Sequence, residues 1–302
     1  MSTLASRTSA FDTLVHFKNW WPILLGLLVL YVPTYWMLAH DLWNTEDYAH
    51  GPIVLVVTLY LIWQQRTIFL RDASNHKSTR VEVATGWVLL VFGLLTYAIG
   101  RSQDIIIMEV GSQVPVILGA LLITLGMLSV RALWFALFFL VFMIPLPGFI
   151  VDAVTGPLKQ HVSILAEDIL YAVGYPIARS GVVLSIGQYQ LLVADACSGL
   201  HSIFSLSAMG LLYLYLVAHK SPSRNLILIL CIVPIAFLAN VARVMLLVLV
   251  TYYFGNEAGQ GFVHGFAGIL LFVVGLLFLF AVDAVLGLIF PDKPASGFIK
   301  SA

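Results

Sequence analysis

The sequence predicts an all-α polytopic membrane protein with about eight transmembrane helices. Of its 302 residues, 61% are hydrophobic and only 10% are charged. The apolar residues gather in stretches close to the roughly 20 residues that a helix needs to cross a bilayer. The formal net charge is zero, and two cysteines do not make a disulfide framework. We expect a single integral membrane domain over residues 1–302, surrounded by membrane lipids and with no nucleic acid among its partners.

Eight apolar runs define the expected spans. They cover approximately residues 20–39, 51–65, 84–100, 105–129, 132–151, 198–218, 225–253 and 264–290. Residues 1–17 are polar, and the first run lacks a convincing small-residue cleavage site, so we expect the first span to stay in the mature protein.

The basic residues predict the orientation, because lysine and arginine are retained on the cytoplasmic side. With the N-terminus inside, most of the 15 basic residues fall on that side, namely Arg7, Lys18, Arg66, Arg71, Lys77, Arg80, Arg131, Lys220, Arg224, Lys293 and Lys300. The others are Arg101, Lys159 and Arg179 outside and Arg243 within the bilayer. We expect cytoplasmic tails at 1–19 and 291–302, an extracytoplasmic region at 151–196, and a location in the cytoplasmic (inner) membrane.

The external region begins after Pro145, Pro147 and Gly148, which are expected to end the fifth span. From Val151 to Val173, apolar residues recur at steps of three or four, a spacing that predicts an amphipathic helix on the membrane surface. A helix that packs onto the bundle and takes no part in chemistry is the alternative.

A short β-hairpin is expected directly before the candidate nucleophile. The segments Val182–Ile186 and Tyr189–Val193 are rich in β-formers and are separated by Gly187-Gln188, a tight-turn pair. The second strand leads straight towards Cys197. A strand that feeds a helix start would hold a nucleophile rigidly, although the same pattern also fits a surface flap.

Cys197 is the candidate nucleophile, at the outer mouth of the sixth span. Asp195 is a plausible cap there, and the unpaired amides and helix dipole at a helix start favour a thiolate. The alternative is a buried and inert cysteine. Cys231 lies in the inner half of the seventh span, about 20 Å of helix rise away, and we interpret it as a packing residue.

Arg243 is a candidate site residue because apolar residues surround it in the seventh span. An arginine at that depth costs at least ~2.5 kcal/mol to insert, so it should have a partner or a purpose. Asn240 lies three residues earlier on the same helical face and could hold the guanidinium. The alternative is a snorkelling or structural arginine. We interpret Asp283, in the last apolar run, as structural and near the inner interface.

His264 is the candidate acid and base. It opens the eighth span at the outer face, where an imidazole can exchange protons near neutral pH, although a lone interfacial histidine can also be silent. His201, one helical turn after Cys197, competes for the same role. Zinc binding by these histidines together with His50, at the start of the second span, has no ligand spacing to support it. No metal and no cofactor is therefore expected.

The chain resembles the exosortase/archaeosortase family of membrane cysteine transpeptidases and proteases. The resemblance rests on four features, Tyr48-Ala49-His50-Gly51, Ala196-Cys197-Ser198-Gly199-Leu200, Asn240-Val241-Ala242-Arg243 and the outer His264. It extends over about residues 20–290. It implies that Cys197, Arg243 and His264 are catalytic. Many members carry arginine where this chain has His201.

The resemblance also implies the substrate, an exported protein whose C-terminus carries a sorting signal. That signal consists of a short motif such as Pro-Glu-Pro, a transmembrane helix and a basic tail. Cleavage at the outer face of the membrane would pass through a thioester on Cys197. Four residues are expected to support the site: Asn240, Ser198, His201 and His50.

Two other classes of function remain open. One is a membrane transporter or flippase in which Arg243 binds an anionic group. It predicts inverted repeats and broken helices in both halves of the chain, where only Pro234 interrupts a span. The other is a non-enzymatic assembly factor for envelope polysaccharide.

Overall fold

The computed structural model describes residues 10–45, 48–66, 79–192, 199–219, 221–260 and 262–290. Cys197, Ser198 and the expected tail 291–302 lie outside the described residues, and so do the side chains of His201 and His264. The expected tail 1–19 is described only from Ala10, where the first helix already begins.

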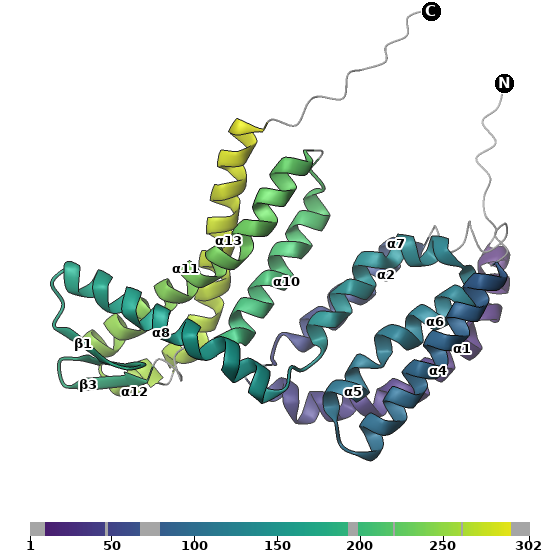
Figure 1. The fold of residues 1–302 in the computed structure, drawn as a ribbon, viewed down its shortest axis with the longest axis horizontal. Helices are drawn as coiled ribbons and strands as arrows, with labels where there is room; N and C mark the ends of the chain where they lie inside the picture. The colour runs from purple at the N-terminus through teal and green to yellow at the C-terminus, as the bar shows by residue number, and fades with distance from the viewer. Residues whose placement is uncertain are drawn as a thin grey trace, which may run out of the picture. The chain divides into compact units, whose positions relative to one another are not determined.

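The chain divides into two compact units, residues 1–146 and 147–302 (Figure 1). The first unit holds helices α1 (Ala10–His40), α2 (Gly51–Gln64), α4 (Arg80–Ser102), α5 (Ile106–Gly111), α6 (Gln113–Leu125) and α7 (Met127–Phe139), with short 3-10 helices η1 (Leu42–Asn44) and η2 (Leu140–Met143). The prediction of one integral membrane domain over the whole chain stays a prediction.

The second unit holds the candidate catalytic segments. Its elements are α8 (Gly148–Ala172), β1 (Ile177–Ser180), β2 (Val183–Ile186), β3 (Tyr189–Leu192), α10 (Gly199–Val217), α11 (Pro222–Phe254), α12 (Asn256–Gln260) and α13 (Phe262–Ile289).

The mostly helical, multi-pass character of the prediction is confirmed. In the described part of the chain, five helical segments are long and apolar enough to cross a membrane, namely Trp21–Asn44, Arg80–Ser102, Ile106–Leu125, Pro222–Phe254 and Ile269–Ile289. Three shorter apolar helices accompany them, Gly51–Gln64, Met127–Met143 and Phe204–Val217. These segments overlap the eight expected spans, while the count of eight crossings and the cytoplasmic termini stay predictions.

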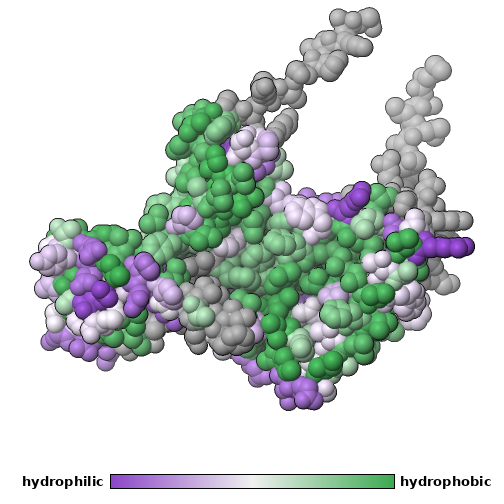
Figure 2. Space-filling model, viewed as in Figure 1, coloured by the Kyte–Doolittle hydropathy of each residue, from purple (hydrophilic) through white to green (hydrophobic). Residues whose placement is uncertain are grey.

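Apolar side chains cover the helices, and hydrophilic ones gather around α8 and the sheet in the second unit (Figure 2). On α13, for example, Leu277 and Leu288 are strongly exposed. A water-soluble protein would bury such side chains, whereas lipid accommodates them at no cost.

The expected boundary between the fourth and fifth spans is wrong by several residues. The sequence suggested a break after residue 129, but α6 ends at Leu125 and α7 begins at Met127. Gly126 separates them with a φ of 72°, a backbone conformation that favours glycine and stops the helix. Apolar residues on both sides of Gly126 concealed this break.

The β-hairpin is confirmed, and the structure adds a strand. β2 and β3 pair antiparallel with Ile186 opposite Tyr189. β1 pairs with β2 through Ser180 opposite Val183, so the hairpin is the edge of a three-stranded antiparallel sheet. Gly181 and Gly187 have positive φ at the first central position of the two turns, as type II′ hairpins require. The sequence concealed β1 because it contains one β-branched residue.

The expected amphipathic helix is α8, but its buried stripe differs by one residue from the expected one. Val162, Ala166 and Leu170 are fully buried, whereas Val173 is 71% exposed. The buried residues pack against the sheet and against the C-terminal half of α11 in one apolar cluster. For this half of α8, packing onto the bundle is therefore the correct interpretation.

Candidate active site

Arg243 is a buried residue in the middle of a long apolar helix. Its exposed fraction is 3%, and Asn240, one helical turn earlier, is exposed by only 1%. α11 is longer than a membrane-spanning helix needs to be, so it extends well past Arg243 to Phe254. The guanidinium is therefore enclosed by protein, and the expected support of Arg243 by Asn240 stays a prediction.

The packing partners of α11 change near Arg243. On the N-terminal side, Ala236 and Ala239 pack with Leu206 of α10 and Leu271 of α13. On the C-terminal side, the buried residues from Val241 onwards pack with α8 and the sheet. Arg243 thus lies where the three-helix bundle gives way to the α8 and sheet layer.

Two close contacts show how α10, α11 and α13, which run side by side, are aligned along their axes (Figure 1). Gly210 of α10 lies against Ile232 of α11, where an added Cβ would lie 3.0 Å from the isoleucine Cγ1. Gly275 of α13 lies against Leu206 of α10, where an added Cβ would lie 2.6 Å from a leucine methyl carbon. The cavity among these helices is about 10 Å³, which leaves room for a single water at most.

This register brings the start of α10 level with Arg243. Only a short connection links α10 to α11, and the two helices run antiparallel. Gly199 precedes Gly210 by as many residues as Arg243 follows Ile232. Both therefore lie about 16 Å from the contact of Gly210 with Ile232, and about three full helical turns keep them on the facing sides.

The first turn of α13 lies near the same level. His264 precedes Gly275 by three helical turns, which places position 264 on the helix face that carries Gly275. Counting from the contact with Leu206, position 264 and Gly199 differ in level by about 6 Å. Cys197 lies outside the described residues, two positions before the first residue of α10.

His50 and Tyr48 belong to the first unit. His50 is the N-cap of α2, and its ring Nε2 donates to the carbonyl of Phe142 at 3.2 Å. The Tyr48 hydroxyl donates to the carbonyl of Leu146 at 3.3 Å. A side chain at Gly51 would overlap the Trp43 indole, which explains the glycine of this motif. The motif therefore closes the turn before α2 against the end of the first unit.

No metal-binding group is found where side chains are described. No three His, Cys, Asp or Glu side chains among those residues lie close enough together to hold an ion. This statement covers the side chain of His50, whereas the side chains of His201 and His264 lie outside the described residues.

The sequence model of one protein family, described as transmembrane exosortase, matches residues 42–281. The matched range contains Cys197, Arg243 and His264 as well as the motif around His50. No curated protein and no solved structure matches the chain.

Proposed function

The chain belongs to the transmembrane exosortase family, a family of cysteine-type membrane transpeptidases, and on that premise we propose how it acts. It cleaves the C-terminal sorting signal of exported proteins at the outer face of the cytoplasmic membrane. The nucleophile is Cys197, the oxyanion partner is Arg243 and the proton carrier is His264. The observation that carries this assignment is the common level of the start of α10, Arg243 and the first turn of α13.

The reaction begins when the Cys197 thiolate attacks the scissile carbonyl carbon. The carbonyl π electrons move to oxygen, and the resulting oxyanion is stabilised by the Arg243 guanidinium. Burial strengthens this interaction, because a charge at 3% exposure is screened little by water. Asn240 lies buried one helical turn before Arg243.

Collapse of the tetrahedral intermediate breaks the peptide C–N bond. His264 in its protonated form gives a proton to the leaving amine, and an acyl thioester remains on Cys197. His264, now neutral, removes a proton from water or from an acceptor nucleophile, which attacks the thioester and releases the Cys197 thiolate. Water gives hydrolysis, and an acceptor gives transpeptidation.

The substrate presents its motif at this site while its own helix crosses the membrane. Its basic tail stays in the cytoplasm under the same charge rule that orients this chain. Exported proteins with such a signal, together with membrane lipids, are the expected partners.

Co-expression with a tagged exported protein that carries a sorting signal tests the nucleophile. Wild type is expected to shorten the tagged protein, and Cys197→Ala is expected to leave it whole. Cys231→Ala is the matched control, because Cys231 packs in the apolar cluster of α10, α11 and α13 and should be dispensable. Unchanged processing by Cys197→Ala would falsify the assignment, and the mass of the product separates hydrolysis from transfer.

A membrane-impermeant thiol reagent tests the orientation. Cys197 is expected to react from the outside of intact cells, and Cys231 only after the membrane is dissolved. Reaction of Cys197 exclusively from the cytoplasmic side would exclude an outer active site.

A further inference from the structure

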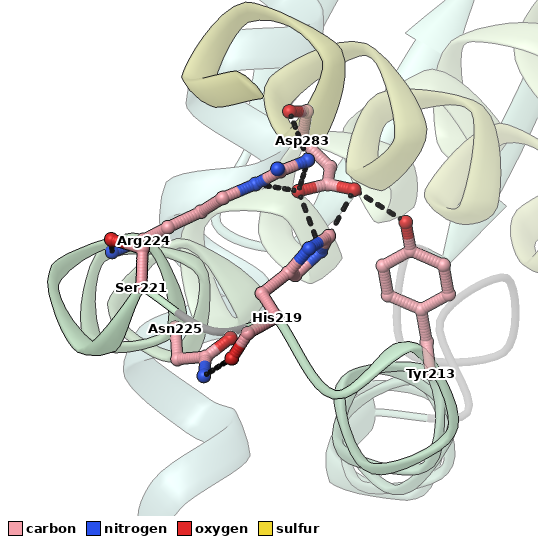
Figure 3. Close-up of polar contacts among 6 residues, drawn as sticks. All are labelled: Tyr213, His219, Ser221, Arg224, Asn225 and Asp283. Atoms are coloured by element: carbon pink, nitrogen blue, oxygen red, sulfur yellow. Dashed lines mark hydrogen bonds and ion pairs between the residues drawn. The ribbon is translucent and has the colours of Figure 1, made fainter. Parts of the chain in front are cut away.

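Three side chains of the second unit converge on Asp283 (Figure 3). The Tyr213 hydroxyl of α10 donates to Oδ2 at 2.6 Å. Arg224 of α11 reaches Oδ1 through Nε at 2.8 Å and through Nη2 at 2.7 Å. His219, in the connection between these helices, places Nε2 3.1 Å from Oδ1 and 3.2 Å from Oδ2. We call these four residues, Tyr213, His219, Arg224 and Asp283, the Asp283 cluster.

The Asp283 cluster holds backbone as well as side chains. Arg224 Nη2 also donates to the main-chain carbonyl of Asp283 at 3.0 Å. A Cβ added to Gly287, one turn later in α13, would lie 3.2 Å from the same nitrogen. Asn225 Nδ2 donates to the carbonyl of His219 at 3.0 Å and so fixes the connection between α10 and α11. The Arg224 guanidinium therefore binds the backbone of α13 directly.

The cluster is buried and its acceptors are occupied. The side-chain exposures of His219, Arg224 and Asp283 are 7%, 11% and 9%. Donors from the chain itself engage both carboxylate oxygens, so a ligand would first have to displace one of them. Burial of the charges is tolerated only because the pairing is this complete.

The helices that meet at Asp283 are the three helices of the candidate active site. Arg224 and Arg243 lie on the same helix, about 28 Å apart by helix rise. Between them the bundle is held by Leu206, Ile232 and other apolar side chains. Apolar contacts are not directional and resist axial sliding weakly, whereas a network of short hydrogen bonds allows one register.

We propose that the Asp283 cluster is a positioning element that fixes the register of α10, α11 and α13 and thereby holds Cys197, Arg243 and His264 in reacting geometry. This inference rests on the proposed function. Loss of the cluster would let the helices shift by part of a turn, and a displacement of about 1 Å at the reacting atoms can cost about 100-fold in rate.

The decisive variant is the double substitution Arg224→Met with Asp283→Leu. It removes the guanidinium and the carboxylate together, so neither of these two charges is left buried without the other, and the protein is expected to fold. Val285→Ala, at a lipid-exposed position two residues after Asp283, is the matched control. Folding of each variant is checked by its elution as a single species in detergent.

Two measurements distinguish positioning from stability alone. The first separates kcat from KM for signal cleavage, where the double variant is expected to lose at least about tenfold in kcat with little change in KM. The second is the pH dependence of Cys197 alkylation, whose midpoint is expected to rise by about one pH unit when Arg243 and the thiolate are no longer held together. A merely less stable protein would keep the wild-type midpoint in its folded fraction.

Conservative substitution supplies the rescue. Arg224→Lys keeps a positive charge beside Asp283 but loses the paired contacts that the guanidinium Nε and Nη2 make. Its kcat is therefore expected between those of wild type and the double variant. A folded double variant with wild-type kcat and alkylation midpoint would overturn the positioning role. Failure of the proposed function has a different signature, because Cys197→Ala would then process the signal whatever the state of the cluster.

Discussion

α11 carries two buried arginines whose surroundings differ. Arg224, near its N-terminus, is bound to Asp283 by three short contacts to the carboxylate and the main-chain carbonyl. Arg243, about 28 Å further along, has a buried amide, Asn240, one turn before it and lies level with the start of α10. Both residues are buried, with whole-residue exposed fractions of 9% for Arg224 and 3% for Arg243.

The difference shows that a buried arginine can contribute either to structure or to catalysis. A guanidinium neutralised by a carboxylate contributes structure, since its charge is already compensated. A guanidinium that lies level with the candidate nucleophile can act on a developing oxyanion. The comparison predicts that stability depends mainly on Arg224 and catalysis mainly on Arg243.

Arg224→Ala is expected to have the largest effect. It leaves the Asp283 carboxylate buried without its main cation, which should lower the free energy of unfolding by about 3–5 kcal/mol. Unfolding in mixed detergent micelles measures this, with Ser223→Ala at an exposed neighbouring position as control. A loss below about 1 kcal/mol would mean that the Asp283 pair does not hold the helices together.

Arg243→Ala is expected to act on the reaction. Removal of an oxyanion donor lowers kcat by about 100- to 1000-fold, while the unfolding free energy should change less than in Arg224→Ala. Cleavage of the sorting signal and unfolding are measured on the same preparation. If Arg243→Ala unfolds readily and its folded fraction cleaves at the wild-type rate, the two arginines have been assigned the wrong way round.

The sequence indicated a functional role for Arg243 but no special role for Arg224. An arginine among apolar residues in mid-span is conspicuous, because the cost of burial demands an explanation. Arg224 lies at the start of a span, where the charge rule already accounts for it. Asp283 was correctly interpreted as structural, but its partners come from α10, from α11 and from the connection between them, and sequence spacing cannot bring these together.

For the fold, the sequence predicted the local elements but not the alignment between them. Spans and the hairpin follow from hydropathy and turn residues, which are local properties of the chain. The alignment between helices does not, since the close approaches that reveal it occur at Gly210 and Gly275, two glycines among many in the sequence. The common level of the candidate catalytic segments therefore needed the structure, and the roles of Cys197, Arg243 and His264 stay predictions.

Arg101→Ala extends the comparison to a half-exposed arginine in the first unit. Arg101 Nη1 lies 3.1 Å from Glu109 Oε1, and the side-chain exposures are 48% and 3%. Glu109 keeps the hydroxyl of Thr34, which donates to the same oxygen at 2.5 Å. The expected loss of unfolding free energy is about 1–2 kcal/mol, below that of Arg224→Ala. Gln103→Ala, at an exposed neighbouring position, is the control. A loss as large as that of Arg224→Ala would show that the exposure of the arginine does not determine how much such a pair contributes to the free energy of unfolding.

Arg179→Ala is expected to have the smallest effect of the four. Arg179 Nε donates to Glu167 Oε2 at 3.0 Å, and both side chains are 26% exposed, so water and ions screen the pair. Nη1 also donates to the carbonyl of Gly181 in the turn between β1 and β2. A double-mutant cycle with Glu167→Gln isolates the pair, and its coupling is expected below about 1 kcal/mol and smaller still in 1 M salt. The apolar cluster of α8, the sheet and α11 would then hold this layer, because Val162, Leu184 and Val244 stay buried whether or not the ion pair forms. A coupling that is large and independent of salt would instead make Arg179 a third structural arginine comparable to Arg224.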